Sequence, residues 1–324
     1  SFYSKVQLIS MLVFTAAFFL FFIYLFRHIK KENKKTAFII GLFFISFGGI
    51  AFYYLDWAEP DIYILCLTFI SFICILKGRF LFIVPVNCAL SAMIHEGYPL
   101  MLFMLVMVPL FYKWLSAEKL SADKYFFTLL VSGLVTSALF IYFYFFSEVG
   151  KGVSLEYVQQ RALDLTKTDQ KQNIEYLFFG GSAPMNGFWE NGKHTKYLLK
   201  DFVNILMNIA LYLPILYYIF KVKKDVLHKC ENAKEKIKYA VCSLGFAFLA
   251  ILFLSHTDTG RWLNDFWLYE LFIFMFMLVT GDKYFTESLK DNLKSITTAK
   301  AFLLCAPYFM LSFAINKQWI NLLT

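Results

Sequence analysis

Two ionisable side chains stand together inside a long apolar stretch of this sequence. His95 and Glu96 open the segment HEGYPL, and the run between Arg79 and Lys113 holds no other His, Asp, Glu, Lys or Arg. Imidazole and carboxylate groups are the usual general acids and bases of enzymes. Charge at membrane depth is costly, so the pair predicts either a functional site or a satisfied polar contact between helices.

Two other short polar stretches contain side chains of the same kinds. The acids Asp56, Glu59 and Asp61 lie in DWAEPD, and HTDTGRW contains His256, Asp258, Arg261 and Trp262. Titratable groups from separate loops that converge over a cleft define a candidate active site. Simpler interpretations stay open: the acids also fit a solvated turn, and the Arg-Trp pair also fits an interfacial anchor.

The composition predicts that helices in a membrane position these groups. The chain has 324 residues and is 59% hydrophobic, whereas soluble domains are about 45–50% apolar. Because a spanning helix needs about 20 apolar residues, we expect an all-α polytopic bundle of about ten spans, forming one integral membrane domain over residues 1–324. The spans are placed near 6–26, 37–54, 62–76, 80–94, 97–112, 125–146, 202–220, 239–255, 262–280 and 300–316.

Basic residues are distributed very unevenly among the predicted loops. Five stretches hold 21 Lys and Arg, near 27–35, 77–79, 113–124, 221–238 and 282–300. The three short polar turns between them hold only Arg261. Since membrane proteins place Lys and Arg on the cytoplasmic side, the five stretches are predicted to be cytoplasmic loops and the polar turns to face out.

This charge pattern also predicts a hairpin around His95. Arg79 and Lys113 must both be inside, so an even number of passes separates them. The segment HEGYP is then the tip of a tight turn between helices 80–94 and 97–112, in which Gly97 and Pro99 suit the turn and the new helix start. The alternative is one long tilted helix with the His-Glu pair buried.

Arg261 is predicted to bind phosphate or pyrophosphate. It stands at the start of a span, where the helix N-terminus carries partial positive charge, and its guanidinium matches phosphate geometry. The long outer segment 148–201 contains a predicted interfacial amphipathic helix, VSLEYVQQRALDL. That helix carries apolar residues at helical spacing and includes Arg161.

The motifs predict no cofactor and no nucleic-acid partner. Neither a Walker lysine motif nor GxGxxG occurs, and Pro99 interrupts the HExxH pattern of zinc proteases. His95, Glu96, His256 and Asp258 could assemble a divalent-metal site across two loops, but their spacing does not demand one. The net charge of +8 is interpreted as membrane topology.

HEGYPLMLF in a mid-chain apolar hairpin and HTDTGRWLNDFW opening a late span resemble bacterial surface-polysaccharide repeat-unit polymerases. These are the O-antigen and capsule polymerases and the EpsG-like proteins. The resemblance covers the hydropathy profile and the loop layout, including a long external loop with basic residues. It implies polymerisation or transfer of polyprenyl-pyrophosphate-linked oligosaccharide units on the outer face of the plasma (inner) membrane.

Under this resemblance the site residues take definite roles. His95 or Glu96 is the candidate base for the acceptor hydroxyl, and Asp258 joins the catalytic group. Arg261 is the candidate partner of the departing pyrophosphate, helped by Arg161 or Lys193, with His256, Trp262, Asp56, Glu59 and Asp61 as further substrate-binding candidates. The expected partners are the lipid bilayer, the polyprenyl-linked oligosaccharide, and a chain-length regulator or flippase.

Two alternatives remain open. A multi-pass glycosyltransferase with a polyprenyl-phosphate sugar donor is similar in placing acids in its first outer loop, although DWAEPD lacks the usual helical insertion there. A transporter or flippase should carry charged residues along its helix interiors. The predicted spans are nearly free of charge except at Glu270, which makes the transporter the third choice.

Overall fold

The computed structural model describes residues 2–46, 61–95, 98–100, 102–118, 120, 123–143, 157, 160, 213, 215–245 and 259–315. All regular elements in these ranges are helical, which confirms the predicted all-α class. The predicted amphipathic helix of the outer segment 148–201 lies outside these ranges apart from Tyr157 and Gln160, both helical.

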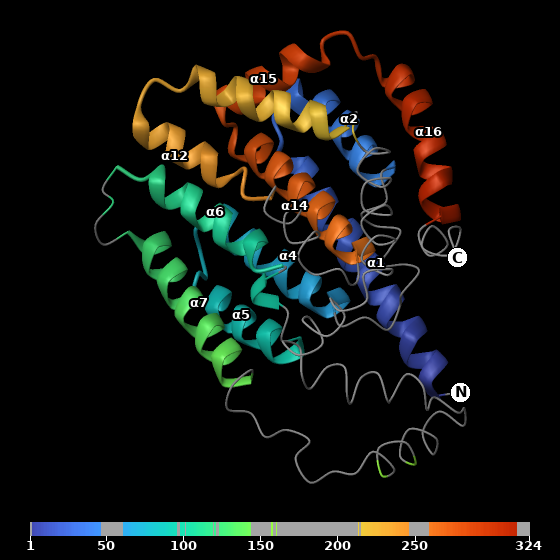
Figure 1. Ribbon diagram of the computed structural model, residues 1–324, viewed down its shortest axis with the longest axis vertical. Helices are drawn as coiled ribbons and strands as arrows, with labels where there is room; N and C mark the ends of the chain where they lie inside the picture. Colours follow the sequence, from blue (N-terminus) through green and yellow to red (C-terminus); the bar gives the residue numbers. More distant parts are fainter. Residues whose placement is uncertain are drawn as a thin grey trace, which may run out of the picture.

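Helices occupy the described parts of nine of the ten apolar segments in which spans were predicted (Figure 1). They are α1 (Phe2–His28), α2 (Lys34–Ser46), α4 (Asp61–Lys77), α5 (Ile83–Ile94), α6 (Met104–Leu115), α7 (Lys124–Ile141), α14 (Thr259–Thr280) and α16 (Thr298–Ile315). A further helix covers residues 215–229. In the predicted span 239–255 only residues 239–245 are described, and the chain leaves its helix after residue 241 and forms a turn at 242–245. Two 3₁₀ turns, η1 (Lys31–Asn33) and η2 (Tyr98–Leu100), lie in connections.

The stretch 221–238 is not the loop that the sequence predicted. Its first part continues the helix over residues 215–229, and its second part forms most of α12 (Ala233–Val241). Asn232 caps α12, since its side chain accepts a hydrogen bond from the Glu235 N–H at 2.9 Å. The dense charge concealed a helical hairpin.

The prediction of a loop over residues 282–300 was wrong for the same reason. Most of this stretch is α15 (Lys283–Leu293), which buries Phe285 and Leu289 on one face. Residues four apart share a helix face, so this pattern buries one side and leaves lysines on the other. The many charged residues of this stretch led to the prediction of a loop, although its few apolar residues have the spacing of an amphipathic helix.

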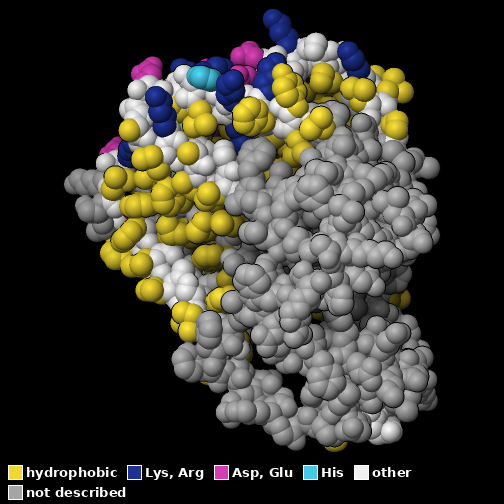
Figure 2. Space-filling view, in the orientation of Figure 1, with side chains coloured by type: hydrophobic (Ala, Val, Ile, Leu, Met, Phe, Trp, Pro, Cys, Tyr) yellow, Lys and Arg dark blue, Asp and Glu magenta, His cyan; other side chains and the backbone are white. Residues whose placement is uncertain are grey.

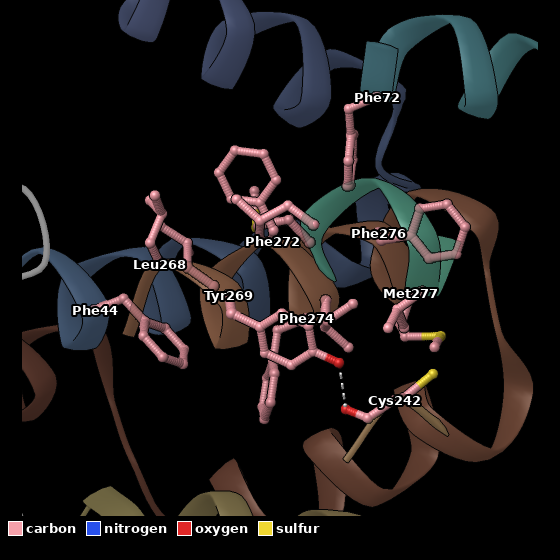
Figure 3. Close-up of a cluster of buried hydrophobic side chains, with 14 of the residues drawn as sticks. Phe44, Phe72, Cys242, Leu268, Tyr269, Phe272, Phe274, Phe276 and Met277 are labelled. Atoms are coloured by element: carbon pink, nitrogen blue, oxygen red, sulfur yellow. Dashed lines mark hydrogen bonds between the residues drawn. The ribbon is translucent and has the colours of Figure 1, made fainter. Parts of the chain in front are cut away.

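The core is organised around α14, which lies in the middle of the bundle (Figure 1). This helix contacts α1, α2 and α6, and its residues 265–278 are buried all round, as expected of a helix without a polar face. The ring centroid of Phe272 lies 5.2 Å from that of Phe21 in α1 and 5.1 Å from that of Phe72 in α4. Figure 3 shows part of this aromatic cluster.

The three helices α1, α4 and α14 run in the same direction. Ser10 and Tyr63 share a hydrogen bond of 2.6 Å near the starts of α1 and α4, and Phe21 meets Phe72 further along both. Between α4 and α14, Phe72 likewise meets Phe276 at 5.6 Å. Their N-terminal ends therefore lie at one end of the bundle.

The five basic stretches meet at the other end. Lys290 lies 4.0 Å from Glu32, Asn292 donates to Asp225 at 3.0 Å, and Lys234 donates to the Ala117 carbonyl at 3.1 Å. Lys124 donates to the Gly78 carbonyl at 2.8 Å, so the chain of contacts joins all five. In Figure 2 the charged side chains gather at one end above an apolar band. The prediction that these stretches share one face is confirmed; we call this face the basic end.

The hairpin around His95 is confirmed, although it is not tight. α5 begins beside the basic end, and α6 returns to it, since Trp114 packs on Phe126 at the start of α7 with centroids 5.0 Å apart. Residues 95–103, including η2, connect the two helices. One long tilted helix is thus excluded. At twelve residues, each arm spans about 18 Å.

Apolar side chains cover much of the outer surface of the described helices. The segments Leu8–His28 and Lys124–Ile141 are long and apolar enough to cross a membrane, and Ile83–Ile94, Met104–Leu115 and Thr298–Pro307 are shorter apolar helices. Two such crossings among the described residues leave the predicted count of ten unconfirmed. Many of their outward side chains are exposed, for example Leu134 at 62% and Leu303 at 73%.

Candidate functional site

His95 lies where α5 ends, at the end of the bundle remote from the basic end. Its backbone is extended, with φ −148° and ψ 123°, and its N–H donates to the Ser91 carbonyl at 3.1 Å. Its own carbonyl accepts the Tyr98 N–H at 3.1 Å. The imidazole is half-buried, so the structure holds it at the point where the chain reverses.

Tyr98 holds this chain reversal in place from inside the bundle. Its side chain is 1% exposed, and its hydroxyl donates to the Cys88 Sγ at 3.4 Å, about two helical turns back along α5. The hydroxyls of Ser132 and Thr136, on α7, are buried beside the same thiol. The ring therefore points into the bundle, and the hairpin tip is drawn inward with it.

A polar contact between α4 and α5 lies under the same hairpin. The Asn87 side-chain amide donates to the Ser71 Oγ at 3.0 Å and to the Leu67 carbonyl at 3.1 Å. Asn87 is buried, and a buried amide without partners would be costly. These bonds fix how α5 lies against α4, and so where His95 ends up.

Two buried carboxylates lie at the same level of the bundle. Asp61 is in the first turn of α4 and Asp265 is in the second turn of α14, and each is 1% exposed. Phe69 and Phe272 meet at 5.8 Å, and the two acids precede those rings by eight and seven residues. At 1.5 Å per residue both are therefore about 11–12 Å from that ring pair. Carboxylates are stabilised near helix N-termini.

Most of the other predicted site residues lie outside the described residues. These are Asp56, Glu59, Glu96, Arg161, Lys193, His256 and Asp258. For Arg261 and Trp262 the backbone alone is described, in the first turn of α14. The structure therefore brings His95, Asp61 and the start of α14 to the same end of the bundle.

A buried ion pair escaped the sequence analysis. The Lys223 Nζ lies 2.6 Å from the Glu270 Oε1 and donates to the Cys242 carbonyl at 2.9 Å. The side chains are 5% and 0% exposed. Tyr269 donates to the same carbonyl at 3.2 Å (Figure 3), so the helix over 215–229, the end of α12 and the middle of α14 meet here.

The signal for this pair was present in the sequence. Lys223 was assigned to a cytoplasmic loop because it stands among other lysines. Yet Ile219, Val222 and Val226 are spaced as on one helix face, and Lys223 lies between them on that buried face. Because the predicted span ended at residue 220, the sequence pattern showed Glu270 without the lysine that pairs with it.

A second buried polar cluster ties the basic end together. The Asp282 Oδ2 accepts the hydroxyls of Tyr112 and Tyr239, each at 2.5 Å, while its Oδ1 accepts the Phe285 N–H at 2.8 Å. The Lys238 Nζ lies 4.8 Å from the Tyr112 ring centroid and 4.7 Å from that of Tyr239. One carboxylate thus joins α6, α12 and α15.

The polar groups around His95 and the cluster around Asp282 differ in the chemistry that they allow. A half-buried imidazole can take or give a proton, and the N-termini of α4 and α14 at the same end attract anions. Asp282, by contrast, has its oxygens occupied by three donors. Among the described residues no group of three or more His, Cys, Asp or Glu is arranged to hold a metal ion.

Comparisons with protein-family models, curated proteins and solved structures found no match for this chain.

Proposed function

We propose that this chain is an integral membrane protein whose basic end faces the cytoplasm. The support is an inverted distribution of side chains: large apolar groups face outward on α1, α5, α7 and α16, while Glu270, Lys223 and Asp265 are buried. Large exposed apolar surfaces mark membrane contacts, and ionisable groups in membrane helices face the bundle interior. Ten spans remain our expectation for the whole chain.

The function that this arrangement supports best is polymerisation or transfer of polyprenyl-pyrophosphate-linked oligosaccharide units at the outer face of the plasma (inner) membrane. The observation that carries the proposal is the inward-drawn tip of the hairpin, with its half-buried His95. It lies opposite the basic end, at the same end as the starts of α4 and α14. A lipid-linked substrate has to bring its reacting group to such a membrane-level site.

The proposed reaction assigns one role to each group. His95 or Glu96 takes the proton from the acceptor hydroxyl, whose oxygen then bonds to the anomeric carbon of the donor sugar. The bond from that carbon to the pyrophosphate breaks, and Arg261 with the α14 N-terminus stabilises the departing anion. The acids Asp61 and Asp265 are candidates for holding sugar hydroxyls.

Each alternative function is favoured by one observation. Burial of Asp61 at the start of α4 favours a glycosyltransferase that uses a polyprenyl-phosphate sugar, because such enzymes resemble this chain in their first outer loop. The Lys223–Glu270 pair favours a transporter or flippase, because intramembrane ion pairs mark transport paths. A purified chain that extends glycan without translocating it argues against the transporter.

The test is product chain length from the purified protein supplied with lipid-linked repeat units. We expect His95→Ala or Glu96→Gln to abolish polymer without lowering the amount of inserted protein. His28→Ala is the matched control, since His28 is exposed at the basic end. Normal long polymer from both variants would reduce the pair to a structural role.

Two substitutions of Arg261 distinguish the effect of its charge from that of its guanidinium geometry in the same assay. Arg261→Ala should lose about a hundred- to a thousand-fold in rate, as removal of one donor from a developing anion typically does. Arg261→Lys keeps the charge but loses the guanidinium fork, so it should be strongly impaired as well. Arg27→Ala, at the exposed basic end of α1, is the control. Near-normal turnover of Arg261→Ala would leave this residue an interfacial anchor.

A further inference from the structure

The turn between α4 and α5 is tightly defined at its first residues. The Gly78 N–H donates to the Ile75 carbonyl and the Arg79 N–H to the Cys74 carbonyl, at 3.2 and 3.3 Å. These two backbone hydrogen bonds close the C-terminus of α4, and Gly78 adopts the left-handed conformation at φ +61°. A Cβ on Gly78 would lie 2.4 Å from the Tyr125 hydroxyl, so glycine is required here.

The same turn contains Phe80, whose strained backbone conformation is not offset by burial of its side chain. Phe80 has φ +57°, and it is the one non-glycine residue with positive φ in the described part of the chain. A bulky side chain is disfavoured in that conformation. Its ring is nevertheless 66% exposed, so burial within the described fold does not offset the strain. Strain of this kind is evidence for a role outside the fold.

The turn presents rings and positive charge together. Phe82 is 69% exposed, and its ring lies 6.4 Å from that of Phe80. Lys77 and Arg79 are also exposed. Above them, Val86, Leu90 and Met93 continue the exposed face of α5, at spacings that share one side of a helix.

We propose that this turn, Lys77–Phe82, binds an anionic phospholipid. Arg79 and Lys77 receive the headgroup phosphate, the rings of Phe80 and Phe82 lie at the boundary of headgroup and acyl chain, and the exposed face of α5 carries the chain. A guanidinium binds phosphate through paired hydrogen bonds. Aromatic side chains are enriched at membrane interfaces.

Two observations favour a lipid over a protein partner or a second copy. The charge at the turn is of one sign, as anionic headgroups require. The apolar face begins at the turn and continues up α5 without a polar residue among its exposed positions Phe82, Val86, Leu90 and Met93. This inference rests on the proposed membrane embedding and not on the proposed polymerase activity.

The experiment measures lipid retained by the full chain in detergent, by native mass spectrometry, with phosphatidylglycerol and separately with phosphatidylcholine. Arg79→Gln should lower phosphatidylglycerol retention about fivefold, the usual effect of one basic residue near an anionic surface. Phe80→Gly should lower it as well, while thermal stability stays equal or rises because glycine adopts positive φ freely. Lys290→Gln, exposed elsewhere at the basic end, should change neither measurement.

Several outcomes would overturn the proposal. Equal retention of the two lipids by the wild type, or unchanged retention in Arg79→Gln and Phe80→Gly, removes the headgroup site. A loss of stability in Phe80→Gly would mean that the ring packs within the fold. Dissociation of a dimer by either variant would assign the turn to a second copy. Release of the chain from membranes by alkaline carbonate, without detergent, would contradict the embedding itself.

Discussion

At the basic end, side chains from helices far apart in the sequence meet in direct polar contacts; at the opposite end, among the residues that the structure describes, Asn87 and Tyr98 point into the bundle. Asp282 alone joins three helices, whereas the tip at His95 is held through Tyr98 and Asn87 beneath it. The first pattern holds the helices of the basic end in fixed positions relative to one another. The second leaves the imidazole half-buried at the end of α5.

The Lys223–Glu270 pair, which lies between the two ends, should give the largest effect on stability. Lys223→Met leaves a buried carboxylate without its cation and should cost about 3–5 kcal/mol. The double variant Lys223→Met/Glu270→Met should recover most of that loss, because an apolar pair avoids desolvating the charges. Lys224→Met, the exposed neighbour, is the control. Thermal unfolding in detergent measures all three, and a double variant no better than the single would contradict the account.

Asp282 should give the next largest effect, confined to stability. Asp282→Ala removes two hydroxyl partners and the cap of α15, for which we expect a loss of about 3 kcal/mol. Asp291→Ala is the matched control: its contact with Lys229 is 3.4 Å long and the Asp291 side chain is 73% exposed, so it should cost about 0–1 kcal/mol. Similar melting temperatures of both variants would mean that the buried contacts of Asp282 stabilise the fold no more than the exposed contact of Asp291 does.

These clusters show where sequence reasoning succeeded and where it stopped. Apolar length and charge parity were enough to predict α4, the hairpin at His95 and a common basic end, because both are properties of whole segments and do not depend on which face of a helix is buried. They could not identify Lys223 or Asp282 as buried. That depends on which face of a helix meets a neighbour, which local charge obscures.

The same limit applies to the candidate site. The sequence singled out His95 and Glu96 because they stand together in an apolar run, and the structure places His95 at a helix end. Tyr98 was counted only as part of the polar turn, since nothing in the local pattern shows that its ring reaches back to Cys88. That contact depends on the bond from the Tyr98 N–H to the His95 carbonyl and on the small side chains of Ser132 and Thr136 in α7.

Tyr98 should give the smallest effect on stability but a clear one on activity. Tyr98→Phe loses one hydroxyl bond, or about 1 kcal/mol, yet it loosens the hairpin tip. We expect turnover to fall about tenfold, with KM nearly unchanged, since small misplacements of catalytic groups are costly. Tyr63→Phe, which loses the Ser10 contact at the same end, is the control. Equal activity of both variants would mean that Tyr98 does not position His95.

The central claim is that the basic end faces the cytoplasm and the end bearing His95 faces out, and labelling of single cysteines in intact cells tests it most directly. Burial raises the pKa of the Cys230 thiol, so this native cysteine should react slowly and leave a low background at the basic end, because the thiolate is the reactive form. Ala58→Cys and Gly97→Cys should label with an impermeant reagent from outside, and Glu118→Cys and Glu231→Cys only after permeabilisation. Labelling of Ala58→Cys and Gly97→Cys from opposite sides of the membrane would contradict the account.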